Sequence, residues 1–173
     1  MDIYVVILRL IHIFSGIFWV GTNFFSLFFL TPSVIAAGPA GGAVMGRLAS
    51  SRFPVVIGTA AVLTIVAGSL LFWKDSSGLQ TDFLFSPVGI TISIGALSGI
   101  LAAVVSLGFQ LPITLRMAAI SKEIQASGNP PTPAHMQELQ ALQKRMPVVS
   151  RWGVVLMVIA VIGMATAREL GNL

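Results

Sequence analysis

Long apolar stretches alternate with shorter polar connections along this chain. The first stretch covers residues 3–30 and contains no proline. It is too long and too apolar to be the core helix of a soluble domain. Three further stretches follow at about residues 54–73, 87–110 and 147–167, each opening with a proline, a residue that suits the first turn of a helix. Because about 20 apolar residues span a bilayer, the pattern predicts an all-α, integral membrane four-helix bundle that forms a single transmembrane domain over residues 1–173.

Lysine and arginine gather in the first and third connections, whereas the second connection holds only Lys74 against Asp75 and Asp82. In a four-span protein the first and third connections lie on the same side of the membrane. Since cytoplasmic connections are enriched in basic residues, we expect those two in the cytoplasm and both termini outside. The basic residues concerned are Arg47, Arg52, Arg116, Lys122, Lys144 and Arg145.

Two ionisable residues, Arg9 and His12, lie within the first apolar stretch. On a helix they share one arc with Gly16, Trp19 and Asn23, because side chains three or four residues apart lie on the same face. An ionisable group in hydrocarbon is costly, so this polar arc is predicted to face other helices and the opposite arc to face lipid. The opposite arc carries Phe14, Phe18, Phe25 and Phe29.

Small residues recur every four positions in two later stretches, which lets helix backbones approach closely within a membrane. They are Ala60, Thr64 and Gly68 in the second stretch, and Thr91, Gly95, Gly99 and Ala103 in the third. These stripes indicate ordinary helix packing. Met157 shares an arc of the fourth stretch with other small or methionine side chains, where a methionine most often fills a gap. We expect no internal repeat and no soluble domain.

The residue pattern of the first and third connections also predicts local structure. Residues 36–43, rich in glycine, are expected to be flexible or tightly turned, without a phosphate-binding pattern. After a rigid turn at residues 127–133, an apolar stripe at Met136, Leu139 and Leu142 faces away from glutamine and basic residues. This pattern predicts an amphipathic helix between spans three and four, lying on the cytoplasmic membrane surface or docking on a partner.

The amino-acid composition indicates a membrane protein and excludes several kinds of cofactor site. The chain is 55% hydrophobic and only 9% charged, far below the roughly 25% of soluble domains. The absence of cysteine excludes disulfides, iron–sulfur clusters and covalently attached haem. The net charge of +4 reflects topology and anionic lipid rather than nucleic acid, which we do not expect as a partner. The start at Met1 and Asp2, with a long apolar stretch behind it, favours an uncleaved first span over a signal peptide.

A membrane histidine with an arginine about one turn above it suits haem b, with the imidazole of His12 on iron and the guanidinium of Arg9 on a propionate. Met157, predicted at a similar depth, is a conceivable second axial ligand; an open position or a histidine from another subunit are others. Trp19 and Asn23 would line the same site. The arginine and histidine could instead hold a quinone head, or His12 could bind copper with methionines. The structural alternative is that His12 only bonds a hydroxyl or carbonyl across the bundle. No acidic residue lies mid-span, which argues against a proton-coupled transporter.

Residues 10–34, LIHIFSGIFWVGTNFFSLFFLTPSV, resemble the first span of the copper resistance protein D superfamily and its uncharacterised integral-membrane relatives. A more distant likeness runs to HemJ-type protoporphyrinogen oxidases. The shared pattern is His12, Trp19, Gly21 and Pro32, and the basic segment 143–155 is similar to that of the uncharacterised relatives.

The resemblance implies haem, porphyrin or copper handling in a bacterial cytoplasmic (inner) membrane, and it carries a haem or porphyrin role to His12 alone. A later basic residue of the HemJ-like proteins has no match here. The leading hypothesis is a multi-pass b-type haem-binding or haem-handling redox protein. The alternatives are a non-catalytic accessory subunit of a larger membrane complex, and a copper-handling membrane protein. A homo-oligomer could complete the site, because each chain has only two histidines.

Overall fold

The computed structural model describes residues 2–170, and every secondary-structure element in that range is helical. The elements are, in order, α1 (Ile3–Phe25), the π-helical turn η1 (Ser26–Leu30), α2 (Thr31–Ala36), α3 (Pro39–Ser50), α4 (Phe53–Asp75), α5 (Thr81–Leu84), α6 (Pro87–Val105), the π-helical turn η2 (Ser106–Gln110), α7 (Leu111–Ser127) and α8 (Pro133–Leu170).

Four continuous helical segments are long and apolar enough to cross a membrane, which confirms the predicted four-helix bundle. They cover Ile3–Ala36, Phe53–Asp75, Pro87–Ser127 and Pro133–Ala167. Three of them exceed the roughly 20 residues that a bilayer needs by ten or more, because each continues into what the sequence pattern assigned to a connection. The protein is therefore a multi-pass membrane protein whose spans extend as helices beyond the apolar stretches.

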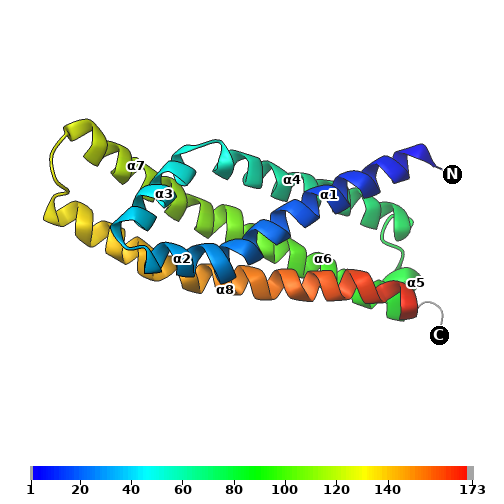
Figure 1. Cartoon of the computed structure of the whole chain (residues 1–173). Helices are drawn as coiled ribbons and strands as arrows, with labels where there is room; N and C mark the ends of the chain where they lie inside the picture. Colours follow the sequence, from blue (N-terminus) through cyan, green and yellow to red (C-terminus); the bar gives the residue numbers. More distant parts are fainter. Residues whose placement is uncertain (1, 171–173) are drawn as a thin grey trace.

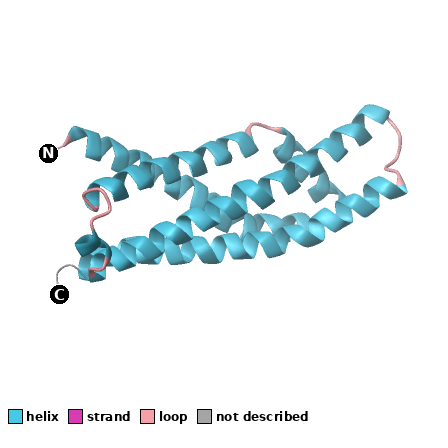
Figure 2. Ribbon diagram, turned by 180° about the vertical axis from the view of Figure 1, so that it is seen from behind, coloured by secondary structure: helices cyan, strands magenta, loops and turns pink. Residues whose placement is uncertain are grey.

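The long helices form two antiparallel pairs, α1 with α4 and α6 with α8 (Figures 1 and 2). In the second pair the backbones come very close at Gly163, where an added Cβ would lie 3.0 Å from the carbonyl oxygen of Thr91 and 3.1 Å from the Cα of Gly95. Small residues allow this approach where the hydrophobic effect gives no driving force between helices. The start of α1 and the end of α8 lie at one end of the bundle, while α3, α7 and the start of α8 lie at the other (Figure 1).

The two pairs meet around Trp19, which is 2% exposed. Its cluster contains alanines from α4 and α6 together with Met157 of α8, which is 1% exposed. A large indole surrounded by small residues fills the space between helices that otherwise approach at their backbones. The alanines are Ala60, Ala61, Ala102 and Ala103.

The opposite face of the first span, formed by α1 and η1, points away from the bundle, as predicted. Its four phenylalanines are all exposed, with 47% to 69% of each side chain accessible. Many aliphatic side chains of α4, α6 and α8 are exposed as well. Such a continuous apolar surface belongs in contact with lipid rather than water, so the bundle presents its outer faces to the bilayer.

Two π-helical turns interrupt the first and third spans, and each ends one residue short of a proline. The N–H of Thr31 bonds to the carbonyl of Ser26, and that of Leu111 to the carbonyl of Ser106. Proline lacks an N–H, and its ring collides with the carbonyl four residues earlier, so one wider turn ahead of it relieves the clash. Pro32 supplies this ring in the first span. Pro112 supplies it in the third span.

These turns correct the expectation that the chain has no repeat. Residues 26–32 read SLFFLTP and residues 106–112 read SLGFQLP, a shared S-L-x-F-x-x-P. The second and fourth spans then start at RFPVV (residues 52–56) and RMPVV (residues 145–149). The first and third spans thus share a motif that ends in proline and a π-helical turn, and the second and fourth spans share a motif at their start. So few shared letters in an apolar background are hidden from a search for periodicity.

Both connections contain the predicted feature, a tight turn in the first and an amphipathic helix in the third, but both are more helical than expected. The glycine-rich segment forms α2 and α3 around a turn at Gly38, which has φ +57°, a conformation that glycine tolerates best. The amphipathic helix is present, but it is the first part of α8 and runs without a break through Pro147 into the last span. It packs beside α7 of the same chain instead of lying alone on the membrane, because Arg116 of α7 pairs with Glu138 of α8 at 2.7 Å and 3.0 Å.

Candidate functional site

His12 lies on the face of α1 that packs against α4, and its side chain is half-buried. Its Nδ1 lies 2.8 Å from the backbone carbonyl oxygen of Thr64. A carbonyl oxygen can only accept a hydrogen bond, so Nδ1 is the nitrogen that carries the proton. In the neutral imidazole the lone pair then resides on Nε2. None of the described residues is hydrogen-bonded to Nε2.

Gly68 makes room for this imidazole. A Cβ added at Gly68 would lie 2.7 Å from Cε1 and 2.8 Å from Nδ1 of His12, closer than carbon atoms approach in proteins. The ring therefore rests directly on the α4 backbone, one turn after the carbonyl that it bonds. This fixes both the position of the ring and the direction of Nε2.

A contact between two hydroxyl groups, those of Ser15 and Thr64, lies beside the bond between His12 and Thr64. Thr64 Oγ1 lies 2.9 Å from Ser15 Oγ, and both residues are buried. Each hydroxyl is also within bonding distance of a carbonyl of its own helix, that of Ile11 for Ser15 and that of Ala60 for Thr64. The two hydroxyls join α1 to α4 one turn below His12 and hold the Thr64 backbone in place for the imidazole.

Arg9 differs from the rest of the polar arc. Its side chain is exposed, whereas Trp19 and Asn23 of the same arc are buried. None of the ion pairs between described residues includes it. Arg9 lies six residues after the start of α1, about 9 Å along the helix, so its long side chain can extend toward the membrane surface while the backbone stays in the bundle. Arg9 therefore departs from the buried part of the polar arc in the way expected of a shallow arginine that extends outward from the bundle.

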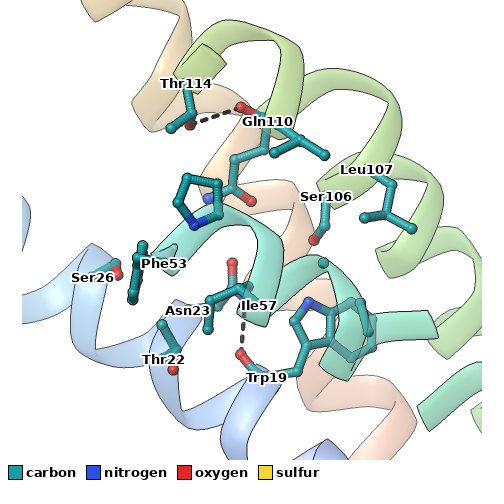
Figure 3. A pocket seen from close by; sticks show the side chains of 14 residues that line it. Trp19, Thr22, Asn23, Ser26, Phe53, Ile57, Ser106, Leu107, Gln110 and Thr114 are labelled. Carbon is teal, nitrogen blue, oxygen red and sulfur yellow. Dashed lines mark hydrogen bonds between the residues drawn. The ribbon is translucent and has the colours of Figure 1, made fainter. Parts of the chain in front are cut away.

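Trp19 and Asn23 line a cavity of about 80 Å³ between α1, α4 and η2 (Figure 3). The amide of Asn23 donates from Nδ2 to the carbonyl of Trp19 at 2.9 Å. Ser106 and Gln110 of η2 line the opposite side. Sequence reasoning did not select these two residues as site candidates, although the repeated serine that opens each π-helical turn marks their position.

Two residues that line this cavity each have a buried polar atom with no hydrogen-bond partner among the described residues. They are Nε1 of Trp19 and Oγ of Ser106, and both are fully enclosed. Buried polar groups are nearly always paired, so an unpaired donor on each side of one cavity is unusual. In Figure 3 the indole nitrogen and the hydroxyl oxygen point toward one another across the space.

Met157 and His12 have different neighbours in the structure. Met157 packs in the cluster around Trp19, and Trp19 lies seven residues further along α1 than His12, about 10 Å by helix rise. The contacts of the His12 ring are with Thr64 and Gly68. His12 also lines none of the three cavities described between the helices, so the imidazole and the Trp19 cavity are separate features.

The second histidine lies far from the first. His135 Nε2 is 3.7 Å from Glu123, at the end of the bundle formed by α7 and the start of α8. There the Arg116 guanidinium bonds Glu138, which holds the pKa of that carboxyl below its usual range and raises the pKa of Arg116. Across residues 2–170, no three histidine or carboxylate side chains gather as metal ligands would. This second polar group therefore joins α7 to α8.

Comparisons with protein-family models, with curated proteins and with solved structures found no match to this chain.

Proposed function

We propose that this protein binds b-type haem in the membrane, with Nε2 of His12 as an axial ligand of the iron. The observation that carries the proposal is the hydrogen bond from Nδ1 of His12 to the Thr64 carbonyl. Histidines that ligate metals commonly donate their other ring N–H to a carbonyl or carboxylate, which fixes the tautomer and aims the ligating nitrogen. His12 has this arrangement.

The surroundings of His12 fit such a group. Gly68 presents no side chain to the imidazole, and an added Cβ would fill that position. Arg9 stands about one turn above His12 on the same arc and has an exposed side chain, so its guanidinium is available to a propionate. Bound haem would supply one-electron redox chemistry. His12 would hold and orient the haem, and Arg9 would balance the charge of a propionate.

Met157 is not included in this proposal, because it is packed around Trp19. His12 is then the only residue of this chain proposed to hold the iron, and a second copy of the chain would supply any further ligand. The resemblance of residues 10–34 to copper resistance D proteins, and more distantly to HemJ-type enzymes, supports haem or metal handling at His12.

We further propose a bacterial cytoplasmic membrane with both termini outside. The basic residues of α3, α7 and the start of α8 support this orientation, because these elements lie at one end of the bundle (Figure 1) and cytoplasmic segments are enriched in lysine and arginine. A reporter that is active only in the cytoplasm, fused after Leu173, should be inactive. An active reporter would reverse the orientation.

The test of haem binding is the absorption spectrum of protein purified from cells supplied with haem. The wild-type chain should show a Soret band at about one haem per binding site, and His12→Ala should lose it. His135→Ala is the matched control, since it removes the other histidine at a distant site, and it should keep the band. A band that persists in His12→Ala would refute His12 as the ligand.

A non-catalytic accessory subunit is the second candidate, because the His12–Thr64 bond also cross-links α1 and α4 without a cofactor. In that case the purified wild-type protein is colourless and free of stoichiometric copper, it co-purifies with partner subunits, and His12→Ala only lowers its stability. Copper at one ion per chain, lost in His12→Ala, would instead support the copper-handling alternative.

A further inference from the structure

The two π-helical turns place equivalent residues at one cavity. Ser26 opens η1 and Ser106 opens η2, and both line the space beside Trp19. Wider turns inside α-helices occur frequently at functional sites. Here each half of the chain contributes one such turn to the same cavity, which lies apart from His12.

The polar atoms of the cavity define what it can hold. Nε1 of Trp19 can only donate a hydrogen bond, so the atom opposite it must be an acceptor. Oγ of Ser106 can donate to the same acceptor. The amide of Asn23 uses its nitrogen for the Trp19 carbonyl and so leaves its oxygen as a hydrogen-bond acceptor. Trp19 and Ser106 are 2% and 8% exposed, so neither unpaired group can reach bulk solvent.

Charge and size limit the ligand further. None of the side chains that line the cavity is ionisable, so nothing there would balance an ion in a membrane interior. The volume is about 80 Å³. One water needs roughly 10–15 Å³ of accessible space, so the cavity admits several waters or the polar end of a larger neutral molecule.

We infer that the cavity between the two π-helical turns binds a neutral ligand through an accepting oxygen, held by Trp19 Nε1 and Ser106 Oγ. Water and the carbonyl group of a membrane-soluble compound share this chemistry. The inference does not depend on haem at His12, since the two features use different residues and lie about two turns apart on α1.

The test follows the indole N–H of Trp19 by NMR in the full-length protein in nanodiscs. Trp73→Phe and Trp152→Phe leave Trp19 as the single tryptophan, and both replaced side chains are exposed. We expect Ser106→Ala to shift the Trp19 indole resonance. Ser98→Ala is the matched control: it removes a buried hydroxyl from α6 that does not line the cavity, and it should leave the resonance in place.

Two results identify the source of the oxygen. A magnetisation-transfer cross-peak between water and the indole N–H assigns it to water. A resonance that shows no water cross-peak, moves on exhaustive delipidation and returns when total lipid extract is added back assigns it to a lipid-soluble carbonyl compound. The inference is overturned if there is no water cross-peak, delipidation has no effect and Ser106→Ala leaves the resonance unmoved, because the indole N–H would then be dry and unbonded.

Discussion

Gly68→Ala tests the contact on which the His12 site depends. The added Cβ would stand 2.7 Å from Cε1 and 2.8 Å from Nδ1 of His12. The ring must rotate away or α1 and α4 must separate. Either response lengthens the 2.8 Å bond from Nδ1 to the Thr64 carbonyl.

The expected change in the free energy of unfolding combines three contributions. Overpacking a filled interior costs about 1–3 kcal/mol, and a lost hydrogen bond adds roughly 0.5–1.5 kcal/mol. Alanine's better helix propensity returns about 1 kcal/mol. We therefore expect Gly68→Ala to lower the free energy of unfolding by about 1–3 kcal/mol. Under the proposed function, haem occupancy falls as well because Nε2 is no longer aimed.

The assay is equilibrium unfolding in mixed micelles, with the imidazole resonances of His12 read in parallel. Gly58→Ala is the matched control on α4, because its Cβ would meet Leu107 at an ordinary 3.7 Å. Gly58→Ala should therefore be neutral or slightly stabilising. If Gly68→Ala matched Gly58→Ala in stability and left the His12 resonances unchanged, the ring would not rest on Gly68 and the geometric argument for His12 as a ligand would fail.

Three further outcomes are expected. Gly163→Ala should destabilise the α6–α8 pair by about 1–3 kcal/mol in the same unfolding assay, since its Cβ would lie 3.0 Å from a carbonyl oxygen of α6, whereas Gly21→Ala, with nothing within 4 Å, should not. Because Arg116 lowers the pKa of Glu138 below its ordinary 4.5, this ion pair contributes stability above that pH and loses it as the pH falls through the lowered pKa. Hydrogen-exchange protection factors within residues 111–146, which are corrected for the intrinsic pH dependence of exchange, should therefore fall in acid, and Arg116→Ala should remove that fall. Pro112→Ala should restore α-helical bonding through residues 106–110, seen as protection of the new amide; unchanged π-helical bonding would refute proline as the cause.

The local pattern of apolar and polar residues predicted the four spans and the two faces of the first span correctly. The four spans follow from uninterrupted apolar stretches, and the exposed phenylalanines and buried Trp19 of α1 follow from helical periodicity alone. Such features depend on residues within two or three turns of each other. The amphipathic stripe after residue 133 likewise predicted a helix, but not that it would be continuous with the last span.

Other features could not be predicted because they depend on contacts between distant residues. The glycine-rich first connection is helical because α3 packs on α7, where Gly46 faces Ser121. The similar depth of Met157 and His12 suggested a shared iron, yet depth does not determine which helix face turns toward which partner. The repeated S-L-x-F-x-x-P motif was readable in the sequence, but its meaning became evident only from the two π-helical turns.

By itself, the sequence determined that this chain crosses a membrane four times and which face of its first helix turns inward, because the hydrophobic period is a local property. Only the tertiary structure decided that α1 pairs with α4 and α6 with α8, since close backbone approach depends on which small residues meet. The same packing decided that the Nδ1 proton of His12 is used by the Thr64 carbonyl. It also decided that Trp19 and Ser106 line one cavity, each with a polar atom that has no partner among the residues the structure describes.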